Sequence, residues 1–248
     1  MSGANDGTVG RWDVSTGENK ETMQVGIGTK DQKWVMSVDI DADGSRIIAG
    51  MKDGRLVGWD FEGNKQSFEG IGVSIRSLFF PPSDPDSVPG VDPDLVTGSE
   101  DGVLRTWDWD RGEVLREFIG HEDLIHCVVG GSGEEGSYYA YSASKDKTVR
   151  VWDLRLGENP TRLRSGEFDP DSFLDRRLTW EQFTFDVIVE VGTVKSELTL
   201  EGANGHSAYV MDVALSADGE RVLSASLDRT ARIWNTATGD EIFRLEHD

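Results

Sequence analysis

The 248-residue sequence is poor in cysteine and histidine, with one cysteine, Cys127, and four histidines. A single thiol cannot form a disulfide within the chain and suits a reducing compartment, so we expect a cytoplasmic or nuclear protein. These residues show no spacing that binds zinc, and no Gly-rich loop ending in Gly-Lys-Ser or Gly-Lys-Thr is present to hold phosphates. We therefore expect no bound metal and no cofactor.

Long apolar runs and positive charges are also scarce. No run approaches the roughly 20 apolar residues that span a bilayer, and the start MSGANDGTVG has neither the basic residues nor the apolar segment of a secretory signal. Lys and Arg number 25 against 46 Asp and Glu, a net charge of -21. Such a surface repels phosphate backbones and anionic lipid, so we expect no direct binding to nucleic acid or membrane. Solubility alone can explain the charge, and if the charge serves binding, basic segments of other proteins would be favoured as partners.

What the sequence does contain is an internal repeat, marked by five tryptophans. They are Trp12, Trp59, Trp107, Trp152 and Trp234, at intervals of 47, 48, 45 and 82 residues. An Asp precedes each of these tryptophans by six residues, and in four of the five segments a Ser or Thr precedes that Asp by four. The last interval is close to two repeats.

Each unit of about 45 residues contains short segments rich in β-forming residues. A first segment such as KWVMSVDI, from Lys33, is followed by a second such as IIAG, by a third that ends in the tryptophan, and by a fourth after it. Four short strands in a unit of this length are typical of one blade of a β-propeller. The sequence therefore predicts an all-β propeller built from four-stranded antiparallel blades.

The repeated dipeptides resemble a known signature. Gly120-His121 and Gly205-His206, together with four Trp-Asp pairs, resemble the Gly-His…Trp-Asp signature of the WD-repeat family; the pairs are Trp12-Asp13, Trp59-Asp60, Trp107-Asp108 and Trp152-Asp153. The resemblance covers nearly the whole chain. It is specific for the fold, whereas one fold of this kind hosts many functions.

We expect one propeller domain over residues 1–248, with about five and a half blades. The predicted units are a partial blade 1–26, blades 27–67, 68–118 and 119–164, a degenerate blade 165–201 without a Trp-Asp pair, and blade 202–248. The first unit holds only its third and fourth strands, and neither end of the chain supplies the missing two. We therefore expect either a fragment of a larger WD-repeat protein or an incomplete ring, whose open edge would favour self-association.

Ser, His and Asp recur with the tryptophans, which raises the question of a hydrolase triad. Two sets repeat with the blades; they are His121, Ser142, Asp146 and Trp152, then His206, Ser224, Asp228 and Trp234. An enzyme has no need for two such sets spaced like a repeat, whereas buried indole and hydroxyl groups do need partners. The family resemblance implies that each set forms a hydrogen-bonded chain inside its blade. We therefore expect a protein without catalytic activity.

In the WD-repeat family, the face that gathers the loops before the first strands is the usual docking surface. The resemblance places eight residues there, at the position before each first strand and the next inward position; they are Trp34, Ser74, Leu124, Tyr209, Met36, Arg76, His126 and Met211. Trp and Tyr often anchor interfaces, although here they could equally pack between blades. The sequence thus predicts a scaffold that binds peptides or protein domains on this face.

One repeat differs from the others at its end. The run SASKDKTVRVWDLR ends in Arg155, which has no counterpart in the other repeats. It resembles the Trp-Asp-x-Arg box of WD-repeat substrate receptors of cullin ubiquitin ligases, although Ala140-Tyr141 replace two aliphatic residues at its start. The resemblance implies that Asp153 and Arg155 lie near an adaptor protein. A ubiquitin-ligase substrate receptor is therefore the alternative function.

Overall fold

The structure is a computed structural model. It describes residues 1–26, 34–60, 62–68, 70–82, 93–132, 138–154, 192–194, 198–200 and 205–246. These residues form strands, labelled β1 to β20, in five sheets. No helix long and apolar enough to cross a bilayer occurs among them. The all-β class predicted from the repeat is confirmed.

The first two sheets come from the N-terminal quarter of the chain. The first contains β1 (Ser2–Gly3), β2 (Thr8–Trp12) and β3 (Asn19–Gln24). The second contains β4 (Val35–Ile40), β5 (Arg46–Met51), β6 (Leu56–Asp60) and β7 (Lys65–Ser67). The two-residue strand β1 pairs with β2 as β5 pairs with β6, so the first sheet has a short remnant of a second strand and complete third and fourth strands.

The other three sheets follow the same order from first to fourth strand. The third contains β8 (Ile75–Phe79), β9 (Leu95–Ser99), β10 (Leu104–Asp108) and β11 (Glu113–Phe118). The fourth contains β12 (Ile125–Ser132), β13 (Tyr138–Ser144), β14 (Val149–Asp153) and β16 (Leu198–Leu200). The fifth contains β17 (Val210–Leu215), β18 (Arg221–Ser226), β19 (Thr230–Asn235) and β20 (Glu241–Glu246).

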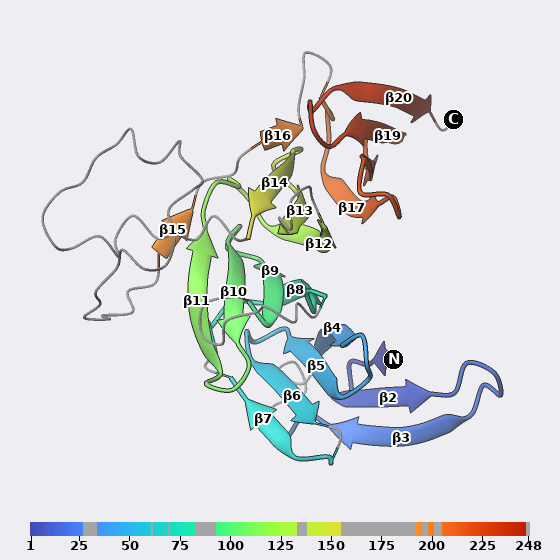
Figure 1. Cartoon of the computed structure of the whole chain (residues 1–248), viewed down its shortest axis with the longest axis vertical. Coiled ribbons are helices and arrows are strands. Elements are labelled where there is room, and N and C mark those ends of the chain that lie inside the picture. Colours follow the sequence, from blue (N-terminus) through green and yellow to red (C-terminus); the bar gives the residue numbers. More distant parts are fainter. Residues whose placement is uncertain are drawn as a thin grey trace, which may run out of the picture.

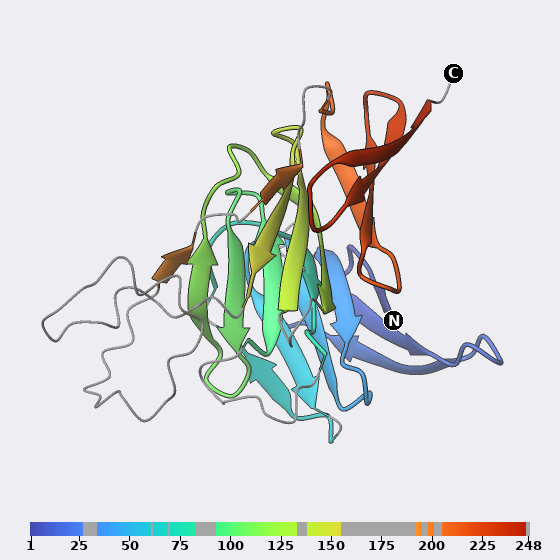
Figure 2. The same cartoon turned by 45° about the horizontal axis from the view of Figure 1, so that its top comes forward.

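The five sheets stand side by side along an arc (Figure 1, Figure 2). The first strands β4, β8, β12 and β17 are neighbours, because β8 contacts β4 and β12, and β12 contacts β17. The arc is open between the first sheet and the fifth, and these two sheets carry the N- and C-terminal segments of the chain (Figure 1). The described sheets form a propeller-like arc that does not close; the sequence predicts either such an incomplete ring or a fragment of a larger one.

The region predicted as a degenerate blade, 165–201, takes a different form where it is described. Strand β16 pairs with β14 and completes the fourth sheet, with Leu200 opposite Val149. Strand β15 (Gly192–Val194) joins the outer edge of the third sheet, parallel to β11. These two strands therefore extend neighbouring sheets and form no sheet of their own, while residues 155–191 lie outside the described residues. Strand β12 packs directly on β17, so the fourth and fifth sheets are direct neighbours.

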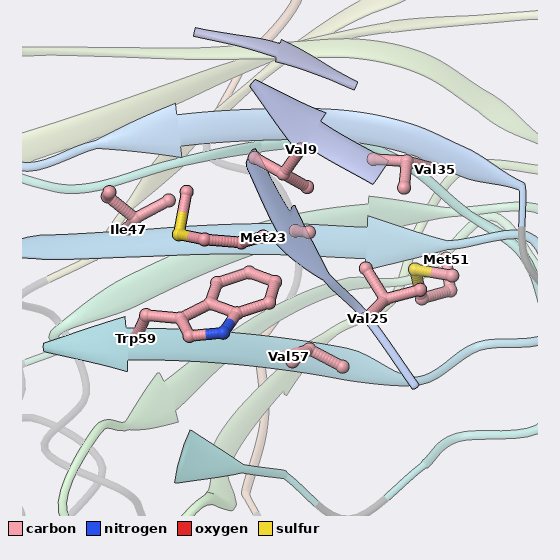
Figure 3. Packing of buried hydrophobic residues seen from close by; sticks show 9 residues of the cluster. Val9, Met23, Val25, Val35, Ile47, Met51, Val57 and Trp59 are labelled. Carbon is pink, nitrogen blue, oxygen red and sulfur yellow. The ribbon is translucent and has the colours of Figure 1, made fainter. Parts of the chain in front are cut away.

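The core lies between neighbouring sheets. Between the first and second sheets, Val9 and Met23 pack against Trp59 and Ile47 (Figure 3). Further along the arc the sheets approach so closely that the second strands carry small residues: a Cβ on Gly98 would lie 2.6 Å from Ile125 Cγ2. Close packing of this kind makes core positions sensitive to added volume. It explains the small residues in Leu-Val-Thr-Gly and its counterparts.

The fifth sheet lacks this cover on one face. On each second strand we compare the residue just before the position aligned with Ser142. In the second, third and fourth sheets this residue is buried; it is Ile48, Val96 and Tyr141, with Tyr141 only 4% exposed. Their counterpart Leu223 is 41% exposed. Across the same face its partners are Ile233, which is partly buried, and Phe243, which is exposed. The face that is covered by the next sheet elsewhere along the arc is therefore open here.

Candidate docking site

A hydrogen-bonded set spans the fourth sheet. His121 Nδ1 lies 2.7 Å from Asp146 Oδ2, and His121 Nε2 lies 2.7 Å from Ser142 Oγ. The indole N–H of Trp152 donates to the same Ser142 oxygen over 2.8 Å. Because the carboxylate of Asp146 accepts, the imidazole carries its proton on Nδ1, and the hydroxyl of Ser142 is left to donate to Nε2.

The electrostatics of this set favour a neutral histidine beside an ionised carboxylate. Burial lowers the pKa of His121. Burial would raise the pKa of Asp146, but hydrogen bonds from His121 and Thr148 outweigh it and hold that pKa well below its usual range. Hydrogen bonds to a charged carboxylate favour the charged form.

The fifth sheet repeats the arrangement. His206 Nδ1 lies 2.8 Å from Asp228 Oδ2, and its Nε2 lies 2.8 Å from Ser224 Oγ, which also accepts the indole N–H of Trp234. Both histidines and both serines are buried. A buried hydroxyl that already bonds an indole and an imidazole has no free side for a substrate, so the two sets act as internal ties.

Sequence reasoning missed one member of each set. Thr148 donates to Asp146 Oδ1 over 2.7 Å, and Thr230 donates to Asp228 Oδ1 over 2.6 Å. The sequence marks this residue as a threonine two positions after the Asp, in Asp-Lys-Thr and Asp-Arg-Thr. In the third sheet Trp107 still donates to Thr97, but Asp101 pairs with Arg105, because that sheet has no histidine to bind it.

Four of the eight predicted docking residues share one backbone position. The carbonyl of each accepts a hydrogen bond from the turn after the second strand of its own sheet. The pairs are Lys52 to Trp34, Glu100 to Ser74, Lys145 to Leu124 and Leu227 to Tyr209, over 2.9 to 3.0 Å. These residues and turns therefore lie at the same end of the four complete sheets, and we call this end the rim.

The other four predicted residues lie in β-bulges. The pairing of first and second strands slips by one residue in every complete sheet, between Val35 and Ser37 and at the equivalent places. The extra residues are Met36, Arg76, His126 and Met211. A bulge of this kind redirects a side chain out of the regular strand pattern, so the structure gives these four residues a common and distinctive position.

The side chains at the rim differ in accessibility. Ser74 is buried, so its side chain is not a surface contact, and Leu124 is partly buried. The ring of Trp34 lies under Lys52, with Nζ 3.9 Å from the ring centroid. Arg76 forms an ion pair with Glu100. Lys52 therefore lies over the Trp34 ring and Glu100 engages Arg76, so these side chains of the second and third sheets are less available to a partner.

The surroundings of His126 at the rim favour its neutral form. Burial lowers its pKa, and the positive charge of Arg76 on the neighbouring strand lowers it further. Its Nε2 has no hydrogen-bond partner among the described residues.

The rim of the fifth sheet is the accessible part. Tyr209 is 40% exposed and Leu227 is 60% exposed, and Met211 is exposed beside them. The amide of Leu227 bonds the carbonyl of Tyr209 over 3.0 Å, so the two residues are neighbours along the rim. Lys145, from the fourth sheet, places its Nζ 5.3 Å from the centroid of the Tyr209 ring. We call Tyr209, Met211 and Leu227 the Tyr209 patch.

The predicted adaptor residues are only partly described. Asp153 is buried at the end of β14, and the buried Leu154 after it accepts a hydrogen bond from Arg116 Nη1 over 3.1 Å. Arg155 lies outside the described residues. No group of three or more His, Cys, Asp or Glu that could hold a metal ion occurs in the part of the chain that the structure describes.

Comparison with known proteins agrees with this geometry. The family model described as "WD domain, G-beta repeat" matches residues 23–60, 112–153 and 195–235. The WD repeat-containing protein pop1 of Schizosaccharomyces pombe is 29% identical over 189 residues, which cover 68% of this chain and 22% of that protein. The nuclear distribution protein nudF of Aspergillus niger is 22% identical over 193 residues, 76% of this chain and 42% of that protein.

A third relative is the ribosome biogenesis protein YTM1 of Saccharomyces cerevisiae, 31% identical over 142 residues, 57% of this chain and 26% of that protein. The chain thus spans between 22% and 42% of the length of these relatives. The successive blades of the arc, the buried His-Ser-Asp-Trp sets and the three family matches lead to one assignment: the chain belongs to the WD-repeat family.

Proposed function

We propose that this chain is a non-catalytic scaffold that binds a peptide or a protein domain at the rim. The observation that carries the proposal is the Tyr209 patch, because it is an exposed apolar group at the edge where equivalent residues of four sheets converge. Exposed apolar groups rimmed by polar residues commonly mark interaction sites. The relatives' names refer to nuclear distribution and ribosome biogenesis, which supports an interaction role and a cytoplasmic or nuclear location.

The test is a binding measurement with a partner captured by the chain, identified, and purified. The double substitution Trp34→Ala and Tyr209→Ala should weaken binding at least about tenfold, since aromatic anchors carry much of the energy of an interface. The control, Glu220→Ala with Glu62→Ala, alters exposed turns at the opposite edge. Equal weakening by the control, or unchanged binding by the rim variant, would remove the rim as the docking site.

The ubiquitin-ligase alternative depends on Arg155. Asp153, the other residue of the predicted adaptor contact, is buried in β14, so its side chain supports the sheet. Arg155→Ala should abolish binding to a purified cullin adaptor if the alternative is right, and should leave the captured rim partner bound. Failure of the unmodified chain to bind any such adaptor would discard this alternative.

We also propose that the chain self-associates through the open face of the fifth sheet. Leu223, Phe243 and Leu245 are exposed on this face. An uncovered apolar sheet face is a site for association with another chain.

A further inference from the structure

The open face of the fifth sheet repeats a face that is covered elsewhere in the arc. One row of side chains crosses the strands of each sheet on this face. In the fourth sheet the row contains Val129, Tyr141 and Val151. In the fifth sheet it contains Ala214, Leu223, Ile233 and Phe243. The row of the fourth sheet packs against the fifth sheet in one apolar cluster, so the open face has the form of a surface that another sheet covers.

A tryptophan lies on each face that provides such cover. At each joint between two complete sheets, the tryptophan of the later sheet shares a core cluster with the second-strand row residue of the earlier sheet. The pairs are Trp107 with Ile48, Trp152 with Val96, and Trp234 with Tyr141. The open face of the fifth sheet therefore matches a sheet face that carries the tryptophan of the repeat.

The first sheet has such a face, and it is exposed. Trp12 is 47% exposed, whereas the other four tryptophans of the repeat are buried. Because side chains alternate along a strand, Trp12 shares its face of β2 with Gly10. The residues opposite Gly10 are Ser2 on β1 and Thr22 on β3. We call Ser2, Gly10, Trp12 and Thr22 the Trp12 face.

The indole of Trp12 is arranged for burial. Its N–H already donates to Ser2 Oγ over 2.7 Å, as the N–H of Trp152 donates to Ser142 in the fourth sheet. The ring lies close against Gly10, because a Cβ on Gly10 would come within 2.7 Å of Trp12 Nε1. A partner that covers this ring would bury a large apolar group without leaving its N–H unpaired.

The first sheet of the same chain does not reach the open face. The arc is open between these two sheets (Figure 1, Figure 2), and Leu223 and Phe243 stay exposed. Contact between the open faces of two copies would cover these residues but would leave Trp12 exposed on both copies. A second copy that presents its Trp12 face instead covers both kinds of surface.

We propose that the open face of the fifth sheet binds the Trp12 face of a second copy of this chain. This inference rests on the proposed self-association and names the surface that the open face meets. The two faces differ, so the contact is head-to-tail, and a pair of copies keeps one free face of each kind. Contacts of this type continue into longer assemblies or close into a ring where the rotation between copies allows it.

The experiment measures the mean mass by light scattering for two variants, alone and mixed. Leu223→Asp with Phe243→Asp charges the open face and keeps the Trp12 face. Thr22→Asp charges the Trp12 face at an exposed position and keeps the indole and the open face. Each variant alone should stay at the monomer mass where the parent chain associates, because burying an unpaired charge is costly. The equimolar mixture should reach about twice the monomer mass and stop there, since one joint remains possible.

The matched control is Val14→Asp, which adds the same charge at a fully exposed turn of the first sheet. This variant should associate like the parent chain. The head-to-tail contact would be overturned if Thr22→Asp associates like the parent chain. A mixture that stays monomeric, or one that grows beyond the dimer, would also overturn it.

The outcomes separate this inference from the proposal on which it rests. If charging the open face abolishes association but Thr22→Asp has no effect, self-association stands and the Trp12 face is not the surface that is bound. If the parent chain stays monomeric at all concentrations, the proposed self-association is itself wrong, and the head-to-tail contact is wrong with it.

Discussion

Trp152 donates its indole N–H to Ser142 Oγ over 2.8 Å, across the pair of strands β14 and β13. Ser142→Ala would leave this buried donor and His121 Nε2 without a partner. We expect the free energy of unfolding to fall by about 1–3 kcal/mol, measured by urea titration.

Thr97→Ala in the third sheet is the internal comparison, because Trp107 bonds Thr97 without a histidine in the chain of bonds. Its loss should be smaller than that of Ser142→Ala. Equal losses of unfolding free energy in the two variants would show that the hydrogen bond of His121 adds no stability to the set.

The repeat predicts most of this fold because, in every sheet, the Asp lies in the turn before the third strand and the Trp, six residues later, lies in that strand. The two histidine sets could also be predicted, since their members recur with the blades. The pairing of β16 with β14 could not, because backbone hydrogen bonds join these strands and the segment Leu198–Leu200 has no Trp-Asp pair to identify its sheet. The exposure of Leu227 likewise depends on neighbouring loops that a spacing pattern does not describe.

Acid should destabilise the chain through the two histidine sets. Burial lowers the pKa of His121 below 6.5, and the pKa of Asp146 lies below 3.8 in the folded protein. The unfolded chain therefore binds more protons, first as the pH falls through 6.5 and again below 3.8, so the contribution is present above these values and is lost on acidification.

Urea midpoints measured from neutral pH downward should fall accordingly. The variant His121→Asn with His206→Asn, although less stable, should show a flatter dependence between neutral pH and about pH 5, where histidine titrates. An identical slope in the variant would contradict the assignment of this range to the two histidines.

Self-association should depend on the open face of the fifth sheet. Light scattering should show the mean mass of the parent chain rising with concentration. Leu223→Asp with Phe243→Asp should abolish this rise, because charge on an apolar face opposes its burial. The control Val14→Asp alters a fully exposed valine in a turn of the first sheet and should associate like the parent. A parent chain that stays monomeric at all concentrations would exclude the proposal.

Cys127 should behave as a structural thiol and not as a reactive one. Burial raises its pKa to about 12, and its Sγ lies 3.7 Å from the carbonyl oxygen of Val213 on the neighbouring strand β17. Since the thiolate is the nucleophile, iodoacetamide at about pH 8 should label the native chain at least about 100-fold more slowly than the chain unfolded in urea.

The labelling also reports on how the fourth and fifth sheets are joined. Val213→Ala leaves the thiol itself unchanged but loosens the contact between β12 and β17, so labelling of the native variant should accelerate. The control Val9→Ala removes a buried side chain from the core between the first and second sheets and, if matched to it in global stability, should accelerate labelling less. Equal acceleration would mean that Cys127 is exposed by global unfolding, and rapid labelling of the parent chain would mean that the two sheets do not cover the thiol.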